Sequence, residues 1–433
     1  MNRTAVLIPT LAIAMALCLP SASSFAAGPA PGDPVAAAAA IFKQGKFAEA
    51  EKAYLYALSR RPQNPEVLTR LGSIALLSNR HADAEKWLVQ ALAAKPGDPA
   101  ASALLAESFF RRDDFAKAAP LFRAAGNAAK AEQLESFKDA RPYALEAEAE
   151  RATLKFVMTD PLPVVQVMVN GYPAVNFFID TGAGEVILDP AYAKEVGAVE
   201  FGSETGTFAG GKKAGYVYGR VDTLNLGDFM IKNVPVQIMD VRRFSVPVFR
   251  GLRVDGIIGT VLLYHFLSTL DYPGGALVLR PALDDVAKAF RDEADRRGAL
   301  SSPFWMAGDH FMVGWGIVNT SSPMLFFLDT GLAGGGFTCP ESTLQAAGIA
   351  LDEAKAGQGI GGGGAVTVVP FKVEQLSFGR VRLKDVAGLY SGPFPLEDAL
   401  GFHIGGLVSH GFFRSCALTL DFRAMKLFLE EKK

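Results

Sequence analysis

The sequence predicts a multidomain protein in which an N-terminal all-α solenoid precedes a mostly-β region with two lobes. Three observations lead to this prediction. Residues 31–138 repeat with a period of 34, the sequence past Lys155 consists of short apolar runs separated by Gly, Asn and Pro, and an Asp-Thr-Gly tripeptide occurs twice in matching surroundings. A period of this length indicates stacked helix pairs, and short runs between turn residues indicate strands.

The N-terminus predicts a cleaved export signal over residues 1–26. Arg3 precedes an apolar run that ends at Leu19, and Ser24-Phe25-Ala26-Ala27 then has small residues where a signal peptidase requires them. The alternative is an uncleaved anchor, although Pro9 interrupts a run that is already short for a membrane span. With the Ala-rich composition, this signal predicts a bacterial protein that is periplasmic or secreted.

Length and charge set further limits. A chain of 433 residues has room for two or three domains, and its net charge of −2 gives no electrostatic reason to expect nucleic acid as a partner. No stretch after the signal is long and apolar enough to span a membrane. Only Cys339 and Cys416 follow the signal, and their spacing leaves open both a disulfide and two buried thiols.

The first predicted module, residues 31–138, is helical. Phe47, His81 and Phe115 lie 34 residues apart, since 81 − 47 and 115 − 81 are equal. This pattern resembles the tetratricopeptide repeat family, with the best copy over residues 71–96. The resemblance implies about three helix pairs, a capping helix at the end, and a groove that binds a protein or peptide. A spacer or a dimerisation module is the alternative.

The chain after the repeats divides into four segments. Residues 139–154, rich in Ala, Glu and Arg, are expected to be a linker or a connecting helix. Residues 155–280 and 300–433 are expected to form the two β-lobes. Residues 281–299 are strongly charged and predict a helical connector between the lobes.

The two lobes share a sequence frame around Asp180 and Asp329. Each Asp ends an apolar run, which predicts a buried strand, and Asn170 and Asn319 each lie ten residues before the Asp of their lobe. Asn-Gly at Asn170 suits a tight hairpin turn between strands over residues 164–179. The second copy predicts the same hairpin with a looser turn.

The frame continues downstream of each Asp. A short strand, a Pro and a helix are followed by a glycine-rich loop, at residues 206–211 in the first copy and 359–364 in the second. An apolar segment then ends at Gly259 in the first copy and at Ser409 in the second, 79 and 80 residues after the respective Asp. The agreement of these separations indicates a duplicated lobe.

This order of motifs resembles the aspartic peptidases: an apolar run into Asp-Thr-Gly, a glycine-rich flap, and an apolar-apolar-Gly segment. Two short halves with a flap in each resemble a fused pair of retropepsin lobes more than a pepsin-like enzyme. Ser409 stands where the family pattern has Gly, so we expect looser packing behind Asp329. The resemblance implies a bilobal aspartic-protease fold over most of residues 155–433.

By this resemblance, Asp180 and Asp329 form the catalytic pair. Two carboxylates at close range cannot both ionise cheaply, so one proton is shared. The pair would activate a water that attacks the peptide carbonyl. The resemblance also implies an optimum less acidic than that of pepsin, because Ala183 and Leu332 offer no hydroxyl beside the carboxylates.

The remaining site residues are implied in two groups. The first group braces the two catalytic loops and lets them approach, and consists of Thr181, Gly182, Thr330 and Gly331. The second group gives each flap a mobile backbone that closes over substrate, and consists of Gly210, Gly211, Gly362 and Gly363.

The expected activity is that of an exported aspartic endopeptidase acting on a peptide or protein, with the repeats recruiting substrate or a partner protein. No cofactor is expected, and the five His show no spacing typical of metal ligands. The alternative function is a catalytically inactive scaffold that binds peptides in the double lobe and the repeat groove.

Overall fold

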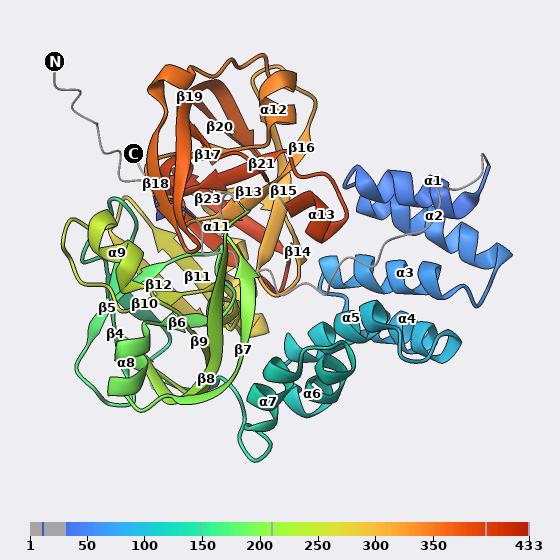
Figure 1. The fold of residues 1–433 in the computed structure, drawn as a ribbon, viewed down its shortest axis with the longest axis horizontal. Coiled ribbons are helices and arrows are strands. Elements are labelled where there is room, and N and C mark those ends of the chain that lie inside the picture. Colours follow the sequence, from blue (N-terminus) through green and yellow to red (C-terminus); the bar gives the residue numbers. More distant parts are fainter. Residues whose placement is uncertain (1–10, 13–31, 148, 209–210, 395, 432–433) are drawn as a thin grey trace.

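The computed structural model describes residues 11–12, 32–147, 149–208, 211–394 and 396–431. Strand β1 (Leu11–Ala12) is the only part of the predicted export signal among them, and the rest of residues 1–26 lies outside the described residues. The export signal therefore stays a prediction. Figure 1 shows a row of helices beside two β-lobes, which is the predicted fold class.

The repeat module consists of antiparallel helix pairs with a further helix at the end. Asn64 and Asp98 each accept a hydrogen bond from the first turn of the helix that follows, and a Pro starts that helix. This cap satisfies amides that have no partner inside the helix. The helices are α1 (Pro34–Lys43), α2 (Phe47–Arg60), α3 (Pro65–Leu77), α4 (His81–Ala94), α5 (Pro99–Phe110), α6 (Phe115–Ala124) and α7 (Ala128–Glu135).

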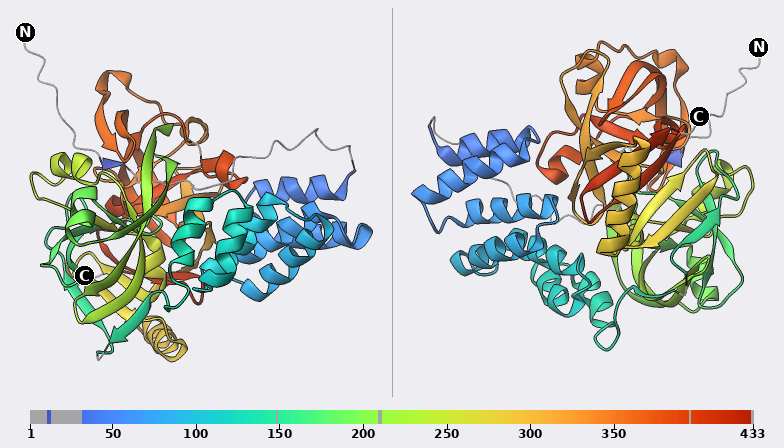
Figure 2. Two further views of the ribbon diagram at one scale, coloured as in Figure 1. Left: turned by 60° about the horizontal axis from the view of Figure 1, so that its bottom comes forward. Right: turned by 180° about the vertical axis from the view of Figure 1, so that it is seen from behind.

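The repeat module packs directly against the β-lobes. The ring centroid of Phe47 lies 5.0 Å from that of Phe402 and 5.5 Å from that of Trp305, and both partners belong to the second lobe. The guanidinium of Arg111, on the C-terminal side of α5, donates a hydrogen bond of 2.9 Å to the carbonyl oxygen of Met306. Aromatic packing and a buried guanidinium thus hold the module in place, and Figure 2 shows its helices beside the lobes.

The structure corrects the prediction of a linker or a connecting helix over residues 139–154, because the described part of this segment contains strand residues. Strand β2 (Ala144–Ala147) pairs with an edge of lobe 1, and β3 (Ala152–Lys155) begins within it. The alternation Ala-Thr-Leu-Lys in β3, buried and exposed in turn, is the strand pattern that the high Ala and Glu content obscured.

Lobe 1 is a sheet of order β2-β9-β6-β10-β5-β4-β8-β7, in which β8 and β9 also pair. Strand β5, which pairs in parallel with β10, carries the chain into the first Asp-Thr-Gly. Its strands are β4 (Val164–Val169), β5 (Val175–Ile179), β6 (Val186–Leu188), β7 (Val199–Thr207), β8 (Lys213–Leu226), β9 (Phe229–Ile238) and β10 (Gly256–Ile258). Its helices are α8 (Pro190–Glu195), α9 (Arg242–Val248) and α10 (Thr260–Tyr264).

Lobe 2 repeats this topology. Its order β19-β20-β17-β21-β16-β15 matches β8-β9-β6-β10-β5-β4, with the same parallel and antiparallel pairings around the central strand. Its strands are β14 (Trp305–Ala307), β15 (Phe311–Val318), β16 (Met324–Asp329), β17 (Phe337–Thr338), β18 (Gly357–Gly361), β19 (Gly364–Phe378), β20 (Val381–Tyr390) and β21 (Gly406–Ser409). Its helical segments are α12 (Glu341–Ala346), η2 (Glu353–Lys355), α13 (Leu396–Leu400) and α14 (His410–Phe413).

The two asparagines of the sequence frame play the same structural part in both lobes. Asn170 adopts a positive φ of 49° and its side chain accepts hydrogen bonds from the amides of Asp222 and Thr223. Asn319 has φ 50° and accepts from the amides of Glu374 and Gln375. Asn tolerates this left-handed backbone, and its amide ties each hairpin turn to the long strand beside it. The predicted hairpins are confirmed.

A third sheet joins the lobes at the pseudo-twofold axis. Strands β11 and β22 pair antiparallel at its centre, where the hydroxyls of Thr269 and Thr419 lie 2.8 Å apart. The predicted connector is helix α11 (Asp284–Arg297), which ends at Gly298 in the left-handed conformation. The other strands are β3, β11 (Phe266–Asp271), β12 (Ala276–Pro281), β13 (Leu300–Pro303), β22 (Cys416–Asp421) and β23 (Lys426–Glu431).

The two thiols that the sequence left open are not joined. Cys339 and Cys416 are both free and both buried. Burial raises the pKa of the Cys416 thiol and that of Cys339 more strongly. Among the helices of the described residues, none is long and apolar enough to span a membrane.

Candidate active site

The two Asp-Thr-Gly segments meet at the pseudo-twofold axis between the lobes. Strand β5 pairs in parallel with β10, and the amide of Asp180 donates to the carbonyl oxygen of Ile258 at 3.0 Å. In lobe 2 the parallel register of β16 and β21 sets Asp329 opposite Ser409. Asp180 and Asp329 are 1% and 0% exposed, so both carboxyls lie inside the protein at a strand end.

The two threonines cross-brace the loops. The amide of Thr181 donates to the hydroxyl of Thr330 at 3.0 Å, and the amide of Thr330 donates to the hydroxyl of Thr181 at 3.0 Å. Each hydroxyl in turn donates to a carbonyl oxygen of the opposite lobe, at Leu328 and at Ile179. Because these four bonds are reciprocal and buried, they fix the separation of the two loops.

The two glycines bring the carboxyls together. The amides of Gly182 and Gly331 donate at 2.7 Å to Oδ1 of Asp180 and Asp329 respectively, which orients each carboxyl within its own loop. A methyl group on either glycine would collide with the carboxyl of the opposite lobe. Only Gly permits this approach, so the structure brings together all six residues that the sequence placed at the centre of the site.

The surroundings of the carboxyl pair raise the pKa of Asp329. Burial, the charge of Asp180 and a hydrogen bond with Asp180 raise the pKa of Asp329 well above its usual range, although the Gly331 amide lowers it. A raised pKa keeps a proton on Asp329 at a pH where an ordinary carboxyl has lost it. The pair can thus hold one proton and one negative charge.

The position of Ser409 differs from the expectation. Its hydroxyl accepts from the amide of Leu332 and donates to the carbonyl oxygen of Leu332, both at 3.1 Å, and the side chain is fully buried. The hydroxyl therefore fills the space behind the second catalytic loop instead of loosening it. In lobe 1 the equivalent Gly259 has the carbonyl oxygens of Gly184 and Glu185 against it, where a side chain would collide.

The glycine-rich loops form the tips of two hairpins, β7–β8 and β18–β19, that meet each other. A Cβ on Gly362 would lie 2.6 Å from Cδ1 of Phe208, and one on Gly363 would collide with Lys212. Gly211 turns the first tip with φ 72°, whereas Gly210 lies outside the described residues. Both flaps thus close on one another.

Apolar side chains connect the flaps to the catalytic loops. Phe208 of the first flap belongs to the same buried cluster as Ala183 and Ala333, which follow the two tripeptides, and Ile360 of the second flap packs against that cluster. The catalytic loops thus have buried apolar side chains beside them, and apolar surroundings strengthen electrostatic effects.

Sequence reasoning missed an anchor behind the first catalytic loop. Glu185 is fully buried and its Oε1 lies 2.5 Å from Nζ of Lys130 on α7. Gln133, one turn further along α7, donates to the carbonyl oxygens of Gly219 and Val236. An acidic residue inside the run Gly-Glu-Val-Ile-Leu was the available signal, but nothing in the sequence linked it to a lysine 55 residues earlier.

Metal ligation receives no support from side-chain geometry. Within the part of the chain that the structure describes, no three His, Cys, Asp or Glu side chains gather in an arrangement that could hold a metal ion.

Comparison with known families matches two parts of the chain. Residues 165–262 match the family model described as aspartyl protease, and residues 42–108 and 88–132 match two tetratricopeptide repeat models. No curated protein matches the chain significantly. The protease match lies within lobe 1, and lobe 2 repeats the strand order and the tripeptide of that lobe. The chain therefore combines a helical module that matches tetratricopeptide repeats with a two-lobed β-region of aspartic-protease fold, whose first lobe matches the aspartyl protease family.

Proposed function

We propose that this protein is an aspartic endopeptidase that cleaves peptide bonds with a water molecule activated between Asp180 and Asp329. The observation that carries the proposal is the buried, reciprocally braced carboxyl pair. Two buried carboxyls in close contact destabilise each other when both are ionised. A turn with a purely structural role would not require such a pair.

The proposed chemistry divides the work between the two carboxyls. The ionised member removes a proton from the water, whose oxygen attacks the carbonyl carbon of the peptide bond. The protonated member polarises the carbonyl oxygen, and a proton then passes to the leaving nitrogen as the carbon–nitrogen bond breaks. The raised pKa of Asp329 favours Asp329 as the protonated member of the resting pair, although the titration belongs to the pair.

The closed flaps supply the second requirement. Strand β7 is an edge of the lobe 1 sheet, and β18 pairs with the short strand β1 at the edge of the lobe 2 sheet. An extended peptide can form main-chain hydrogen bonds with strands in such positions. Substrate entry requires the contact between Phe208 and Gly362 to open. Closure afterwards excludes water other than the one that reacts.

The test is cleavage of a peptide mixture by the purified protein, with Asp180→Asn and Asp329→Asn as matched variants. We expect each variant to lose at least about 10³-fold in kcat/KM, because either change removes the shared proton or the base. Identical product profiles for wild type and both variants, or cleavage that pepstatin leaves untouched, would exclude the proposal. Saturable peptide binding without cleavage would support the inactive scaffold instead.

We also propose that the protein is exported and that the repeat module recruits a protein substrate or partner. The basis for export is the sequence pattern over residues 1–26, and detection of the mature N-terminus by mass spectrometry tests it. The inner helices α3 and α5 line a cavity that the lobes share. A recruited protein would therefore also meet the outer helices, where Leu55, Tyr56 and Val89 are exposed.

A further inference from the structure

Two cavities are lined by residues that hold corresponding positions in the two lobes. Asp160 lines one and Asp309 lines the other, and each lies 20 residues before the catalytic Asp of its own lobe, since 180 − 160 and 329 − 309 are equal. Asp309 touches Gly184, in the loop that carries Asp180, and Asp160 pairs with His410 and Arg414 of lobe 2. Each Asp thus reaches the opposite lobe, as expected of two cavities that the duplication relates.

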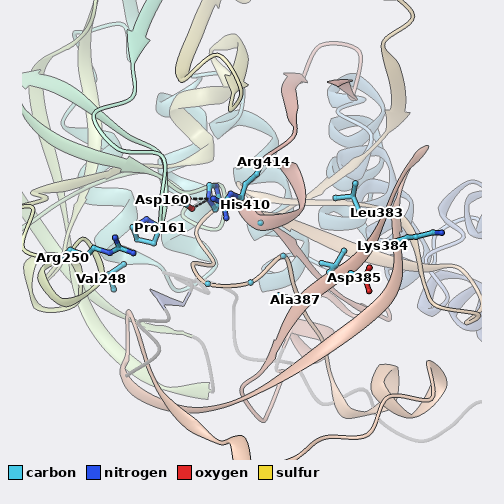
Figure 3. Close-up of a pocket in the computed structure, with 15 residues that line it drawn as sticks. Asp160, Pro161, Val248, Arg250, Leu383, Lys384, Asp385, Ala387, His410 and Arg414 are labelled. Carbon is cyan, nitrogen blue, oxygen red and sulfur yellow. Dashed lines mark hydrogen bonds and ion pairs between the residues drawn. The ribbon is translucent and has the colours of Figure 1, made fainter. Parts of the chain in front are cut away.

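The first cavity, termed the lobe cavity, has a volume of about 470 Å³ and is lined by the lobes alone. Asp160 from lobe 1 faces His410 and Arg414 from lobe 2, and Lys384 and Asp385 lie across the hollow (Figure 3). The carboxylate of Asp160 forms an ion pair with Arg414. The acid at this end of the cleft is thus already neutralised.

The second cavity, termed the module cavity, has a volume of about 250 Å³. Helices α3 and α5 of the repeat module form one wall, and the first catalytic loop and the turn before β15 form the others. A Cβ on Gly184 would lie 3.1 Å from Oδ2 of Asp309, so the Asp309 carboxylate touches the loop that carries Asp180. The cavity is smaller than typical small-molecule pockets, which measure about 300–1,000 Å³. Its size therefore suits one residue of a substrate peptide.

The charges of the module cavity differ in how far they are exposed. The cationic side chains Lys130 and Arg111 are 6% and 2% exposed and already bind Glu185 and Glu107. The side chain of Asp309 is 32% exposed and that of Glu107 is 16% exposed. Both of these cations are thus already paired with a Glu, whereas the ion pair of Asp309 among the described residues is with His310. Arg70, which also lines the cavity, lies over the ring of Phe42 at 5.2 Å.

Two further observations mark Asp309 as a binding group. Burial alone would raise its pKa, but His310, Lys130 and Arg111 outweigh burial and lower it, so the carboxylate is charged at neutral pH. Nδ1 of His310 lies 2.5 Å from the Asp309 carboxylate, and the ring is 2% exposed with Nε2 lacking any partner among the described residues. A buried nitrogen without a partner calls for an explanation, and a ligand that binds beside the partly exposed carboxylate supplies one.

We propose that the module cavity is a specificity subsite at one end of the substrate cleft, where Asp309 binds a positively charged group of the peptide. The group is either the free N-terminal ammonium or the side chain of Lys or Arg, which share the same chemistry. Glu107 and Arg111 of the repeat module line the same cavity as an ion pair, so the module shapes the subsite and contributes to substrate choice. This inference rests on the proposed peptidase function.

The experiment compares cleavage of a defined peptide library by wild type, Asp309→Asn and Asp309→Glu. We expect wild type to favour a positive charge at a fixed distance from the scissile bond. Asp309→Asn should lower kcat/KM for those peptides by about 10- to 100-fold more than for uncharged peptides, the range of one charged hydrogen bond. Asp309→Glu should restore part of the preference. An unchanged preference in Asp309→Asn would overturn the proposal.

Two sets of peptides identify the source of the charge. N-terminal acetylation abolishes the preference if the ammonium binds, whereas replacement of Lys by norleucine abolishes it if the side chain binds. Asp160→Asn is the matched control, because it removes the equivalent carboxylate at the lobe cavity and should leave the preference intact.

Binding separates this proposal from the peptidase proposal. Fluorescence anisotropy with a labelled Lys peptide and its norleucine analogue, on Asp329→Asn, reads the subsite without cleavage. Tighter binding of the Lys peptide that Asp309→Asn removes would support the subsite even if wild type cleaves nothing. Equal affinity for both peptides, and for their N-acetylated forms, would reject the subsite even if wild type is an active peptidase.

Discussion

The two lobes share one strand order but differ in what supports their catalytic loops. Behind Asp180, Gly259 allows two carbonyl oxygens to approach, and the buried Glu185 ties the loop to Lys130 of the repeat module. Behind Asp329, the loop is supported within its own lobe by the hydroxyl of Ser409. The two lobes thus share the strands and loops that hold the carboxyls. They differ because the repeat module contacts the loop of Asp180.

The largest expected effect follows from breaking the contact between module and lobe 1. Glu185→Met leaves the ammonium of Lys130 buried without its carboxylate, which should destabilise the protein by about 3–5 kcal/mol. The double variant Glu185→Met with Lys130→Met should recover much of this loss, because no charge is left unpaired. Chemical denaturation followed by fluorescence measures both. A single variant as stable as wild type would show that the pair does not hold the module.

Exchange of the residues behind the loops gives a smaller effect that separates the lobes. Gly259→Ser should destabilise lobe 1 by about 3 kcal/mol, because the new side chain meets backbone carbonyls that cannot move aside. Ser409→Gly should cost about 2 kcal/mol through the loss of two buried hydrogen bonds. Thermal unfolding of both variants tests the order. Equal costs would mean that the two loops are supported alike.

These two positions also show how far the sequence could predict the structure. The duplicated frame around Asp180 and Asp329 located both lobes, both hairpins and the flaps, because strand period and turn residues are local signals. Ser409 was read as a gap in the family pattern, since its hydroxyl finds a partner only in the folded loop. Strand β3 was concealed by helix-favouring residues around it, and its pairing with β12 is a tertiary contact.

The asymmetric site could not be predicted for a related reason. Asp160 and Asp309 occupy equivalent positions, but nothing in the sequence indicates that Arg414 neutralises one while the repeat module encloses the other. The first contact depends on how the two lobes pack together, and the second depends on how the repeat module packs against them. A family pattern describes one lobe and carries no information about that docking.

The unequal carboxyls predict the pH dependence of activity. The rate should fall as pH rises through the pKa of Asp329, which burial and the charge of Asp180 raise, because the pair then loses its shared proton. At low pH the rate should fall as the second carboxyl gains a proton. We therefore expect a maximum less acidic than that of pepsin. A pH profile of kcat/KM tests this, and a maximum below about pH 3 would contradict the raised pKa.

The smallest expected effect concerns the ion pair of Asp160 and Arg414 at the lobe cavity. This pair is exposed, whereas the pair of Lys130 and Glu185 is buried. Asp160 and Arg414 are each 52% exposed, so solvent screens their attraction and Arg414→Ala should change stability by at most about 1 kcal/mol. The change should shrink further in high salt. Denaturation at two salt concentrations, with Glu185→Met measured alongside, compares the two ends directly. If Arg414→Ala proved as costly as Glu185→Met, the lobes would depend equally on ion pairs, and the repeat module would not explain their difference.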